Sequence, residues 1–347
     1  MRVLVTGDRG YIGAVMVPLL TQAGHTVTGV DSDWFEQSAF SELQGKIVSR
    51  KKDVRDLKPS DLEGLDAVVH LAGLSNDPLG DLNPSLTYEI NHAASVQLAK
   101  LAKQAGVPRF LFSSSCSTYG AASPEELLDE QAEFRPVTPY GRSKVLVEQD
   151  VAKLADSNFS PTFLRNATAY GMSPRLRFDL VLNNLVAWAL TTKRIYIKSD
   201  GTPWRPIVHI EDISRAFIAV LNAPREVIHC EAFNVGQTEE NYQIRDLAEI
   251  VRETVPGCLV EYAQGGSPDT RCYRVDFSKI NRLLPEFKPR WDARKGAKQL
   301  YDTLRIAELR LEDFEGPRYK RIAHLQALLS SGRLGADLRW SRTAMVA

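Results

Sequence analysis

Tyr140 and Lys144 have the residue types and the spacing of an acid/base pair. They stand four positions apart just after Pro139. Because proline suits the first turn of a helix, both side chains are expected on one helical face. An ammonium group beside a phenol stabilises the phenolate, so a tyrosine in that setting can remove a hydroxyl proton near neutral pH, which a free tyrosine with a pKa of about 10 does poorly. The alternative is a surface helix on which the two residues are neighbours without a function.

Hydroxyl groups gather shortly before this helix. The apolar stretch 110–113 predicts a strand, and it runs directly into the hydroxyls of Ser113, Ser114 and Ser115. The carboxyl end of a central strand is where open α/β sheets bind their ligands. We therefore expect the serine run and Tyr140 to converge, with Ser115 orienting a reacting oxygen.

The first twenty residues predict a binding site for a pyrophosphate. Residues 2–6 form an apolar stretch typical of a buried strand, and a turn with Gly7, Gly10 and Gly13 leads into a helix that continues through Leu20. Glycines let the backbone turn tightly and approach a ligand closely. The N–H groups at the start of the next helix then face an anion.

Asp31 indicates which dinucleotide binds there. It follows the next predicted strand, 26–30, and lies 18 residues after Gly13. An acidic group at this place accepts hydrogen bonds from the adenosine ribose and repels a 2′-phosphate, so it favours NAD over NADP. The alternative is that Asp31 only begins a turn. A possible third strand, 46–49, precedes Asp53, which could meet the adenine or lie in a plain loop.

The order of elements along the chain predicts the fold class. A strand at 67–71, an amphipathic helix at 85–105 and the strand at 110–113 continue the alternation of strands and helices. Such alternation implies right-handed crossovers and a doubly wound parallel sheet of the Rossmann type. At 347 residues the chain exceeds the usual size of one core, so a smaller second lobe is expected.

Composition argues against several classes of partner. The 43 basic residues balance the 43 acidic ones without a charged tail, so neither nucleic acid nor an anionic membrane is expected as a partner. The four cysteines contain no CxxC pair, which predicts neither a metal site nor a disulfide framework. The chain opens in a strand without a signal-peptide pattern, and no apolar run approaches about 18 residues. We expect a cytoplasmic protein.

Several short motifs occur in a fixed order along the chain. They are Thr6-Gly7-x-x-Gly10-x-x-Gly13, Asp31, His70-Leu-Ala-Gly73, Ser113-Ser-Ser115, Tyr140-x-x-x-Lys144, Arg205-x-x-x-His209-x-x-Asp212 and Phe233-Asn-Val-Gly236. This combination resembles the extended short-chain dehydrogenase/reductase family, and within it the NAD-dependent nucleotide-sugar epimerases and dehydratases. The resemblance covers about residues 1 to 300, and it is more specific for the family than for the substrate.

The resemblance implies a set of site residues. Ser115, Tyr140 and Lys144 are implied as the catalytic triad, and NAD as the cofactor. The implied NAD site comprises Gly7, Gly10, Tyr11, Ile12, Gly13, Asp31, Asp53, Val54, Leu71, Ala72, Gly73, Asn91, Ser113, Tyr140 and Lys144. The implied contacts of a nucleotide-diphosphate sugar are Ser75, Ser115, Cys116, Ser117, Thr168, Asn183, Asn184, Arg205, Asp269 and Arg271. Arg205 could bind the diphosphate through two parallel hydrogen bonds of its guanidinium. Alternatively, it could form an interdomain salt bridge with Glu211 or Asp212.

The family fold also implies how the chain divides. An NAD-binding domain of 1–169 and about 205–236 is expected, with residues 207–209 and 233–235 returning to it. About 170–204 and 237–310 would form the substrate lobe. The segment 311–347 lies beyond the usual family span, and its stretch 319–329 predicts an added amphipathic helix over the substrate lobe or a subunit contact. The family implies a homodimer that pairs through the helix 85–105 and the helix that carries Tyr140.

Two departures from the family pattern bear on the reaction. Members that eliminate water carry Asp-Glu directly after the catalytic hydroxyl residue, where this chain has Cys116 and Ser117, so a 4,6-dehydration is not expected. Cys116 is then either a small buried side chain beside the site or an acid. Thr168 and Gly266 replace an asparagine and an arginine of galactose-type epimerases, and Arg271 or Arg274 could supply the missing charge.

The pattern favours an NAD-dependent epimerase of a nucleotide-activated sugar. Tyr140 would take a hydroxyl proton, at C4, while hydride passes to NAD and later returns to the opposite face of the transient ketone. A ketoreductase or dehydrogenase of a nucleotide-linked keto-sugar would use the same residues and release its cofactor. A non-catalytic NAD-sensing regulator would share the fold but would not need Tyr140 and Lys144.

Overall fold

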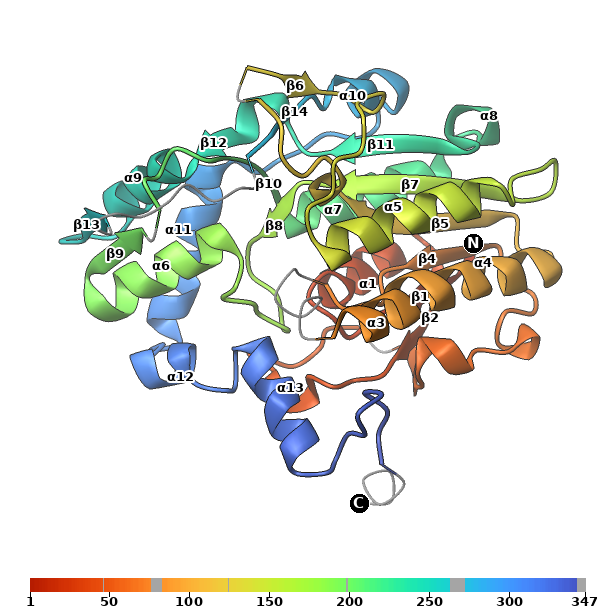
Figure 1. The fold of residues 1–347 in the computed structure, drawn as a ribbon, viewed down its shortest axis with the longest axis horizontal. Coiled ribbons are helices and arrows are strands. Elements are labelled where there is room, and N and C mark those ends of the chain that lie inside the picture. Colours follow the sequence, from red (N-terminus) through yellow and green to blue (C-terminus); the bar gives the residue numbers. More distant parts are fainter. Residues whose placement is uncertain (46, 76–82, 124, 198, 263–271, 342–347) are drawn as a thin grey trace.

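A seven-stranded parallel sheet forms the centre of the molecule (Figure 1). The computed structural model describes residues 1–45, 47–75, 83–123, 125–197, 199–262 and 272–341. The strands run in the order β11-β7-β5-β4-β1-β2-β3. Their bounds are β1 Arg2–Thr6, β2 Thr26–Asp31, β3 Val48–Lys51, β4 Ala67–His70, β5 Arg109–Ser115, β7 Ser160–Asn166 and β11 Glu231–Val235. From β1 the chain extends the sheet through β2 and β3 on one side, and from β4 it extends the sheet through β5, β7 and β11 on the other. The direction therefore reverses between β1 and β4, and this switch point is the expected ligand crevice.

The doubly wound parallel sheet predicted from the sequence is confirmed, with one strand displaced. The third strand was expected at 46–49, but β3 spans Val48–Lys51 and pairs Thr28 with Val48 and Asp31 with Lys51. β3 is an edge strand, and three of its four residues are exposed. Its residues therefore lack the apolar pattern that marks the central strands, and its register is set by β2.

Helices cover both faces of the sheet. Successive side chains of a strand point to opposite faces, so Val3 and Val5 pack under α1 Gly13–Gln22 and α7 Ile210–Asn222. Leu4 points to the opposite face, into a cluster with residues of α4 Ala94–Gln104 and α5 Pro139–Ala152. Because both faces are buried, the central strands are nearly continuous apolar runs.

The helix predicted at 85–105 contains a local irregularity. α3 Pro84–Thr87 continues into a π-helical turn, Tyr88–Ala93, and then into α4. Single π-helical turns inside longer helices are frequent at functional sites. This turn carries Asn91, one of the predicted cofactor residues.

A smaller lobe lies beside the carboxyl ends of the strands (Figure 1). Its helices α6 Val181–Thr192, α9 Ile244–Thr254 and α11 Ala293–Ile306 share one apolar cluster. A three-stranded sheet contains β8 Thr168–Tyr170, β10 Trp204–His209 and β12 Asn241–Gln243. β10 is thus bonded to β8 and β12, whereas β11 joins the main sheet. Shorter elements complete the lobe and its border: β6 Leu127–Leu128, β9 Arg194–Ile197, β13 Leu259–Tyr262, β14 Arg274–Val275, α8 Arg225–Ile228 and α10 Ser278–Leu283.

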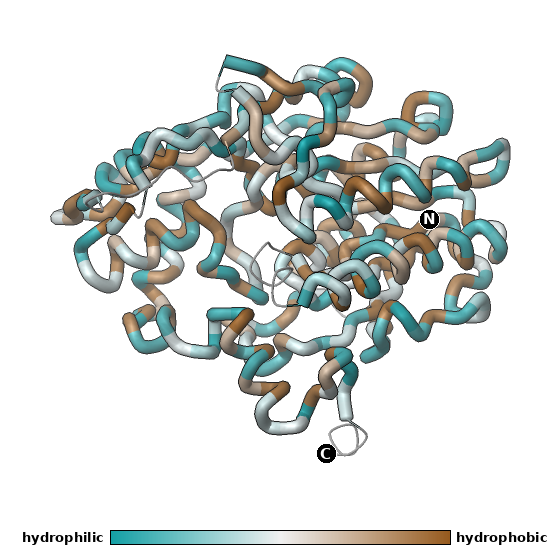
Figure 2. The backbone as a smooth tube through the Cα atoms, in the orientation of Figure 1, coloured by the Kyte–Doolittle hydropathy of each residue, from teal (hydrophilic) through white to brown (hydrophobic). Residues whose placement is uncertain are grey.

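The C-terminal extension forms two helices and a closing turn. α12 Leu311–Glu315 is followed by α13 Arg321–Ser330, and an isolated bridge between Leu334 and Trp340 closes the turn. Figure 2 shows hydrophobic and hydrophilic stretches alternating along α13, as expected of a helix with one buried face. Among the residues with described positions, no helix has the length and hydropathy of a membrane span.

Candidate active site

The glycine turn between β1 and α1 has no room for side chains at two positions. Gly7 has a φ of +77°, and a Cβ atom there would lie 2.8 Å from the backbone nitrogen of Ala72. A Cβ atom on Gly13 would lie 2.2 Å from the carbonyl oxygen of Gly7. The turn therefore folds tightly against the end of β4, and α1 begins at the ligand crevice. A phosphate fits such a helix start.

A chain of buried hydrogen bonds holds the ends of β1 and β4 together. The Ser95 hydroxyl donates to the Asn91 carbonyl at 2.6 Å, so His70 Nε2 must donate to Ser95 Oγ at 2.7 Å. His70 Nδ1 then accepts from the Thr6 hydroxyl at 2.6 Å. Burial lowers the pKa of His70 to about 3, so the ring is neutral. This explains the histidine of the His70-Leu-Ala-Gly73 motif as a support of the glycine turn.

Asp31 ends β2 and Asp53 follows β3, and the surroundings of the two carboxylates differ. Asp31 accepts hydrogen bonds from the backbone N–H groups of Arg9 at 3.1 Å and Asp33 at 2.7 Å. Burial raises the pKa of Asp31 to about 6, and nearby carboxylates add to the shift. Burial acts on Asp53 too, but hydrogen bonds from Arg55 outweigh it and lower the pKa of Asp53. Asp31 is the one of the two whose charge changes near neutral pH.

NAD binding is expected to weaken in mild acid for this reason. Ribose hydroxyls donate best to the ionised carboxylate, so bound NAD favours the deprotonated form of Asp31, and a pH below its pKa opposes binding. With a pKa of about 6, the dissociation constant of NAD should be about tenfold larger at pH 5 than at pH 8. Calorimetric titration over this range measures it. The Asp31→Asn variant should bind more weakly without that pH dependence, and a flat wild-type profile would contradict the assigned role.

A cavity opens at the glycine turn. The predicted cofactor residues that line it are Gly7, Gly10, Tyr11, Ile12, Gly13, Asp31, Asp53, Val54, Leu71, Ala72 and Gly73. Lining residues that were not predicted are Val30, Ser32, Trp34, Phe35, Lys52, Ile90, Arg177 and Arg321. No motif or spacing marked the two arginines in the sequence.

Thr138 and Pro139 start α5 so that Tyr140 and Lys144 lie on one face. The Thr138 side chain accepts from Gly141 N at 3.1 Å, which satisfies one free N–H group of the first turn. Lys144 Nζ lies 5.6 Å from the centroid of the Tyr140 ring and donates to the carbonyl of Ser113 at 2.7 Å. The helix is thereby fastened to the end of β5, as the predicted convergence requires.

Burial disfavours the charged form of Lys144. Loss of hydration lowers its pKa to about 7, against the opposing effect of Glu148 one turn further along α5. Tyr140 lies within electrostatic reach of the cavity residue Arg177. Burial disfavours the charge of Arg177, but Asp179, Tyr11 and Tyr140 outweigh it and raise its pKa. The Tyr140 ring thus has Lys144 beside it and the cavity residue Arg177 within electrostatic reach.

The serine run presents its hydroxyls in different directions. Ser115 Oγ accepts from Ser117 N at 3.1 Å, which leaves its proton for donation to another oxygen. Ser113 Oγ accepts from the amide of Asn166 at 3.1 Å. Ser114 donates to Glu148 on the far side of the strand. Ser113 and Ser115 thus both keep a proton for donation, whereas Ser114 donates to Glu148.

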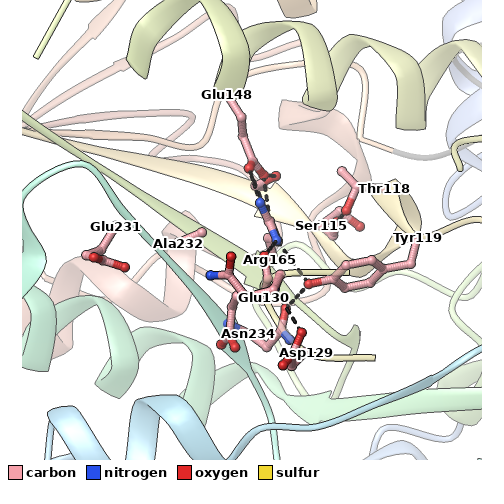
Figure 3. Close-up of polar contacts among 12 residues, drawn as sticks. Ser115, Thr118, Tyr119, Asp129, Glu130, Glu148, Arg165, Glu231, Ala232 and Asn234 are labelled. Atoms are coloured by element: carbon pink, nitrogen blue, oxygen red, sulfur yellow. Dashed lines mark hydrogen bonds and ion pairs between the residues drawn. The ribbon is translucent and has the colours of Figure 1, made fainter. Parts of the chain in front are cut away.

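A buried ion pair joins β7 to the helix that carries Tyr140 (Figure 3). Arg165 of β7 binds Glu148 of α5 through Nη2 at 2.7 Å and through Nε at 3.1 Å. The same guanidinium donates to the Tyr119 hydroxyl at 3.1 Å, and that hydroxyl donates to Asn234 at 2.7 Å. The network ties α5, β7 and β11 together beneath the serine run.

The remaining predicted cofactor and substrate residues fall into different settings. Asn91 is buried and exchanges hydrogen bonds with the backbone of Leu74 at 2.7 and 2.9 Å, so it shapes the loop after β4. Ser75 lines the cavity and accepts from Arg177 at 3.2 Å. Cys116 is 1% exposed and donates to the carbonyl of Arg165 at 3.2 Å. Burial raises the pKa of its thiol, so the thiol stays neutral and faces the protein interior.

Three predicted substrate residues belong to the lobe or its border. Asn183 is fully buried and bonded to Gly171 N, to the Tyr11 hydroxyl and to the carbonyl of Arg177, so it fastens the lobe to the glycine turn. Asn184 donates to the carbonyl of Phe178 at 2.8 Å. Thr168 is half-buried on β8.

The two carboxylates of the predicted salt bridge with Arg205 have donors elsewhere. Asp212 accepts from the backbone of Arg290 and Trp291, and Glu211 accepts from the Trp291 ring. Both alternatives for Arg205, the diphosphate contact and the interdomain salt bridge, stay predictions. Arg205 lies 5.8 Å from the Tyr273 ring centroid and donates to the carbonyl of Trp204. Arg274 Cζ lies 4.8 Å from the centroid of the Trp204 ring.

The hydroxyl of Ser117, another predicted substrate residue, is buried. Asp269, Arg271 and Gly266 lie outside the described residues.

Residues 3–236 match the model of the NAD dependent epimerase/dehydratase family. The chain belongs to this family. UDP-glucose 4-epimerase 4 of Oryza sativa subsp. japonica is 31% identical over 332 residues, which cover 86% of this chain and 87% of that protein. MoeE5, solved in complex with UDP-glucuronic acid and NAD, has a TM-score of 0.77 at 26% identity over 88% of this chain and 100% of its own. TunA, an NAD-dependent NDP-hexosamine 5,6-dehydratase, has a TM-score of 0.77 at 25% identity over 88% of this chain and 98% of its own.

Membership of the epimerase/dehydratase family confirms the predicted fold class and the NAD cofactor. The residues present fit NAD, because the glycine turn has no room for side chains at Gly7 and Gly13 and Asp31 would repel a 2′-phosphate. Relatives of this family include epimerases and a dehydratase. The family therefore establishes an enzyme of the NAD-dependent epimerase/dehydratase type, and the particular reaction must be argued from the site.

Proposed function

We propose that the protein is an NAD-dependent epimerase that inverts C4 of a nucleoside-diphosphate sugar. The observation that carries the proposal is the placement of Tyr140 and Lys144 on one face of α5, with Lys144 fastened to the end of β5 by its bond to Ser113. UDP-hexoses are the first substrates to test, because a relative that is 31% identical is a UDP-glucose 4-epimerase and a solved relative holds UDP-glucuronic acid.

The residues of this chain divide the work of oxidation and reduction at C4. NAD, when bound beside the glycine turn, would supply the redox chemistry, namely the transfer of hydride from and to C4. Tyr140 removes the proton of the C4 hydroxyl in the first half of the reaction and returns it in the second. Lys144 and Arg177 stabilise the phenolate in between, since both are cationic groups near the phenol. Ser115 donates to the C4 oxygen and orients it.

The site lacks the groups that a sugar dehydratase of this family would need. Elimination requires an acid and a base beside the catalytic hydroxyl, and Cys116 and Ser117 occupy those places. The buried Cys116 thiol is directed at the carbonyl of Arg165, and its raised pKa makes it a poor base. We therefore place the protein with the epimerases of its family. Arg205, Asn184 and Asp269 are the proposed holders of the diphosphate, and Thr168 and Ser75 the proposed sugar contacts.

A panel of nucleotide sugars tests the proposed reaction. The purified protein, carrying its own NAD through gel filtration, is incubated with UDP-, dTDP-, GDP- and CDP-hexoses without added cofactor, and the products are identified by NMR. The proposal predicts the C4 epimer of at least one substrate over many turnovers without net NADH. Stoichiometric consumption of NADH with a keto-sugar would instead identify a ketoreductase. Binding of NAD with no turnover of any substrate would favour a regulator.

We further propose that two copies pair through α4 and α5. These helices lie next to each other on one face of the sheet, and His92 contacts Asp150 of α5 at 2.8 Å. Two such helix pairs related by a two-fold axis would form a four-helix bundle. Light scattering during gel filtration should give about twice the chain mass of 38.7 kDa. The mass of a single chain would contradict this arrangement.

A further inference from the structure

The C-terminal extension contacts two parts of the molecule. Phe314 of α12 packs on Trp188 of α6 in the substrate lobe, whereas α13 and the closing turn lie against the loops beside the cofactor cavity. Leu325 and Leu328 of α13 pack with Leu74, Leu86 and Ile90 in a separate apolar cluster. These partners lie after β4 and in the helical run that contains the π-turn. The extension is therefore anchored at the carboxyl edge of the sheet, below the strands in Figure 1.

Hydrogen bonds fasten the extension to the segment directly after Asp31. The Trp340 ring donates to the carbonyl of Ser32 at 2.6 Å. His324 donates through Nε2 to the carbonyl of Trp34 at 2.8 Å and contacts Ser38 through Nδ1 at 3.2 Å. Ser32 and Trp34 both line the cofactor cavity. The extension thus holds one wall of that cavity.

A second set of contacts reaches the loop after β3. Arg55, which binds the carboxylate of Asp53, also donates to the carbonyl of Asp337 at 2.9 Å. Arg339 forms an ion pair with Asp56. Asp53 lines the cavity on the side of this loop. The extension therefore contacts both loops that flank the predicted adenosine half of the cofactor site.

Arg321, the first residue of α13, enters the cavity itself. Its guanidinium lies 4.3 Å from the centroid of the Phe35 ring, and among the described residues it has no hydrogen bond or ion pair. Arg177 lines the same cavity and is paired with Asp179, to which it is bonded at 3.0 Å. Among the described residues that line the cavity, Arg321 is a cation without a bonded counter-charge, although Asp179 and Asp31 act on it electrostatically; burial and the nearby Arg177 lower its pKa to about 9. An anion in the cavity would offset the free-energy cost of burying the charged guanidinium of Arg321.

We propose that the C-terminal extension is a clasp over the NAD site and that Arg321 binds a phosphate group of the dinucleotide. Phosphate is the anionic part of NAD, and a guanidinium over a phosphate forms strong charge-assisted hydrogen bonds. The clasp must loosen before the cofactor can leave, because its contacts run across both adenosine-side loops. The proposal rests on the NAD dependence of the family and is independent of which sugar is epimerised.

Binding measurements on the full-length protein freed of cofactor test the role of Arg321. Calorimetry compares NAD, ADP-ribose and adenosine with the wild type and with Arg321→Gln. The matched control is Arg310→Gln, which changes an exposed arginine of the same region that is paired with Asp313. Arg321→Gln should weaken NAD and ADP-ribose about tenfold or more and leave adenosine, which has no phosphate, unchanged. Arg310→Gln should bind all three like the wild type.

Two results would overturn the proposal. Unchanged NAD affinity of Arg321→Gln would exclude a phosphate contact, and an equal loss for adenosine would show that Arg321 only shapes the loop. Hydrogen exchange tests the clasp without any substitution: NAD should slow amide exchange in α13 and in residues 32–38. Exchange in α13 that is indifferent to NAD would contradict a clasp. These readouts do not depend on activity, so they remain informative if the proposed epimerisation is not found.

Discussion

Replacing Tyr140 by phenylalanine is expected to lower kcat by about a factor of 100 to 10,000, the usual contribution of a positioned acid/base group. The substitution removes the hydroxyl that exchanges a proton with the substrate and keeps the ring against which Lys144 lies. Because the NAD cavity is lined by other side chains, the affinity for NAD should change little. Steady-state kinetics and calorimetric NAD binding measure the two effects separately.

A matched control distinguishes this loss from a general effect of removing a hydroxyl. Tyr196 on β9 is 51% exposed and far from the cofactor cavity by its place in the lobe, so Tyr196→Phe should behave like the wild type. Retention of most activity by Tyr140→Phe would contradict the acid/base role.

The second large effect is expected for stability, from Glu148→Gln. The substitution keeps the shape of the side chain but leaves the guanidinium of Arg165 buried without its counter-charge, and both residues are about 5% exposed. Removing one partner of a buried pair costs about 3–5 kcal/mol in the free energy of unfolding. Denaturant unfolding measures this loss. The variant should also lose activity, because Glu148 opposes the lowering of the Lys144 pKa, and without it less of the ammonium form remains at neutral pH.

Two comparisons separate the buried pair from ordinary surface charge. Glu249→Gln breaks an exposed pair with Arg252 on α9 and should leave the unfolding midpoint nearly unchanged. The double variant Glu148→Leu with Arg165→Met should be less destabilised than the sum of its single variants, since no charge is left unpaired. If Glu148→Gln unfolds like the wild type, the ion pair is not a support of α5.

The sequence predicts those parts of the molecule whose cause is local. β1, the glycine turn and the start of α5 are determined by neighbouring residues, such as the run 2–6, Gly13 and Pro139. Each of these features obeys a rule about a few consecutive positions, so the elements could be placed to within one or two residues. The exposed edge strand β3 has no such pattern and was displaced by two positions.

Features that depend on distant contacts were not predictable. The π-turn around Asn91 coincides with the hydrogen bonds of that amide to Leu74, which no periodicity reveals. Arg321 lies almost 300 positions beyond Phe35, on which it stacks. Arg177 stands in a loop without a motif. Asn183 was predicted from the family pattern, but its bond to the Tyr11 hydroxyl became visible only in the structure.

The most direct measurement of the proposed reaction follows a deuterium label at C4 of a UDP-hexose. The protein is incubated with the labelled sugar in ordinary water without added cofactor, and NMR of the product reports the position of the label. Hydride removal and return within one site predict that the C4 epimer keeps its deuterium at C4 over many turnovers. Loss of deuterium to water, or its release on free NADH without formation of an epimer, would contradict the account.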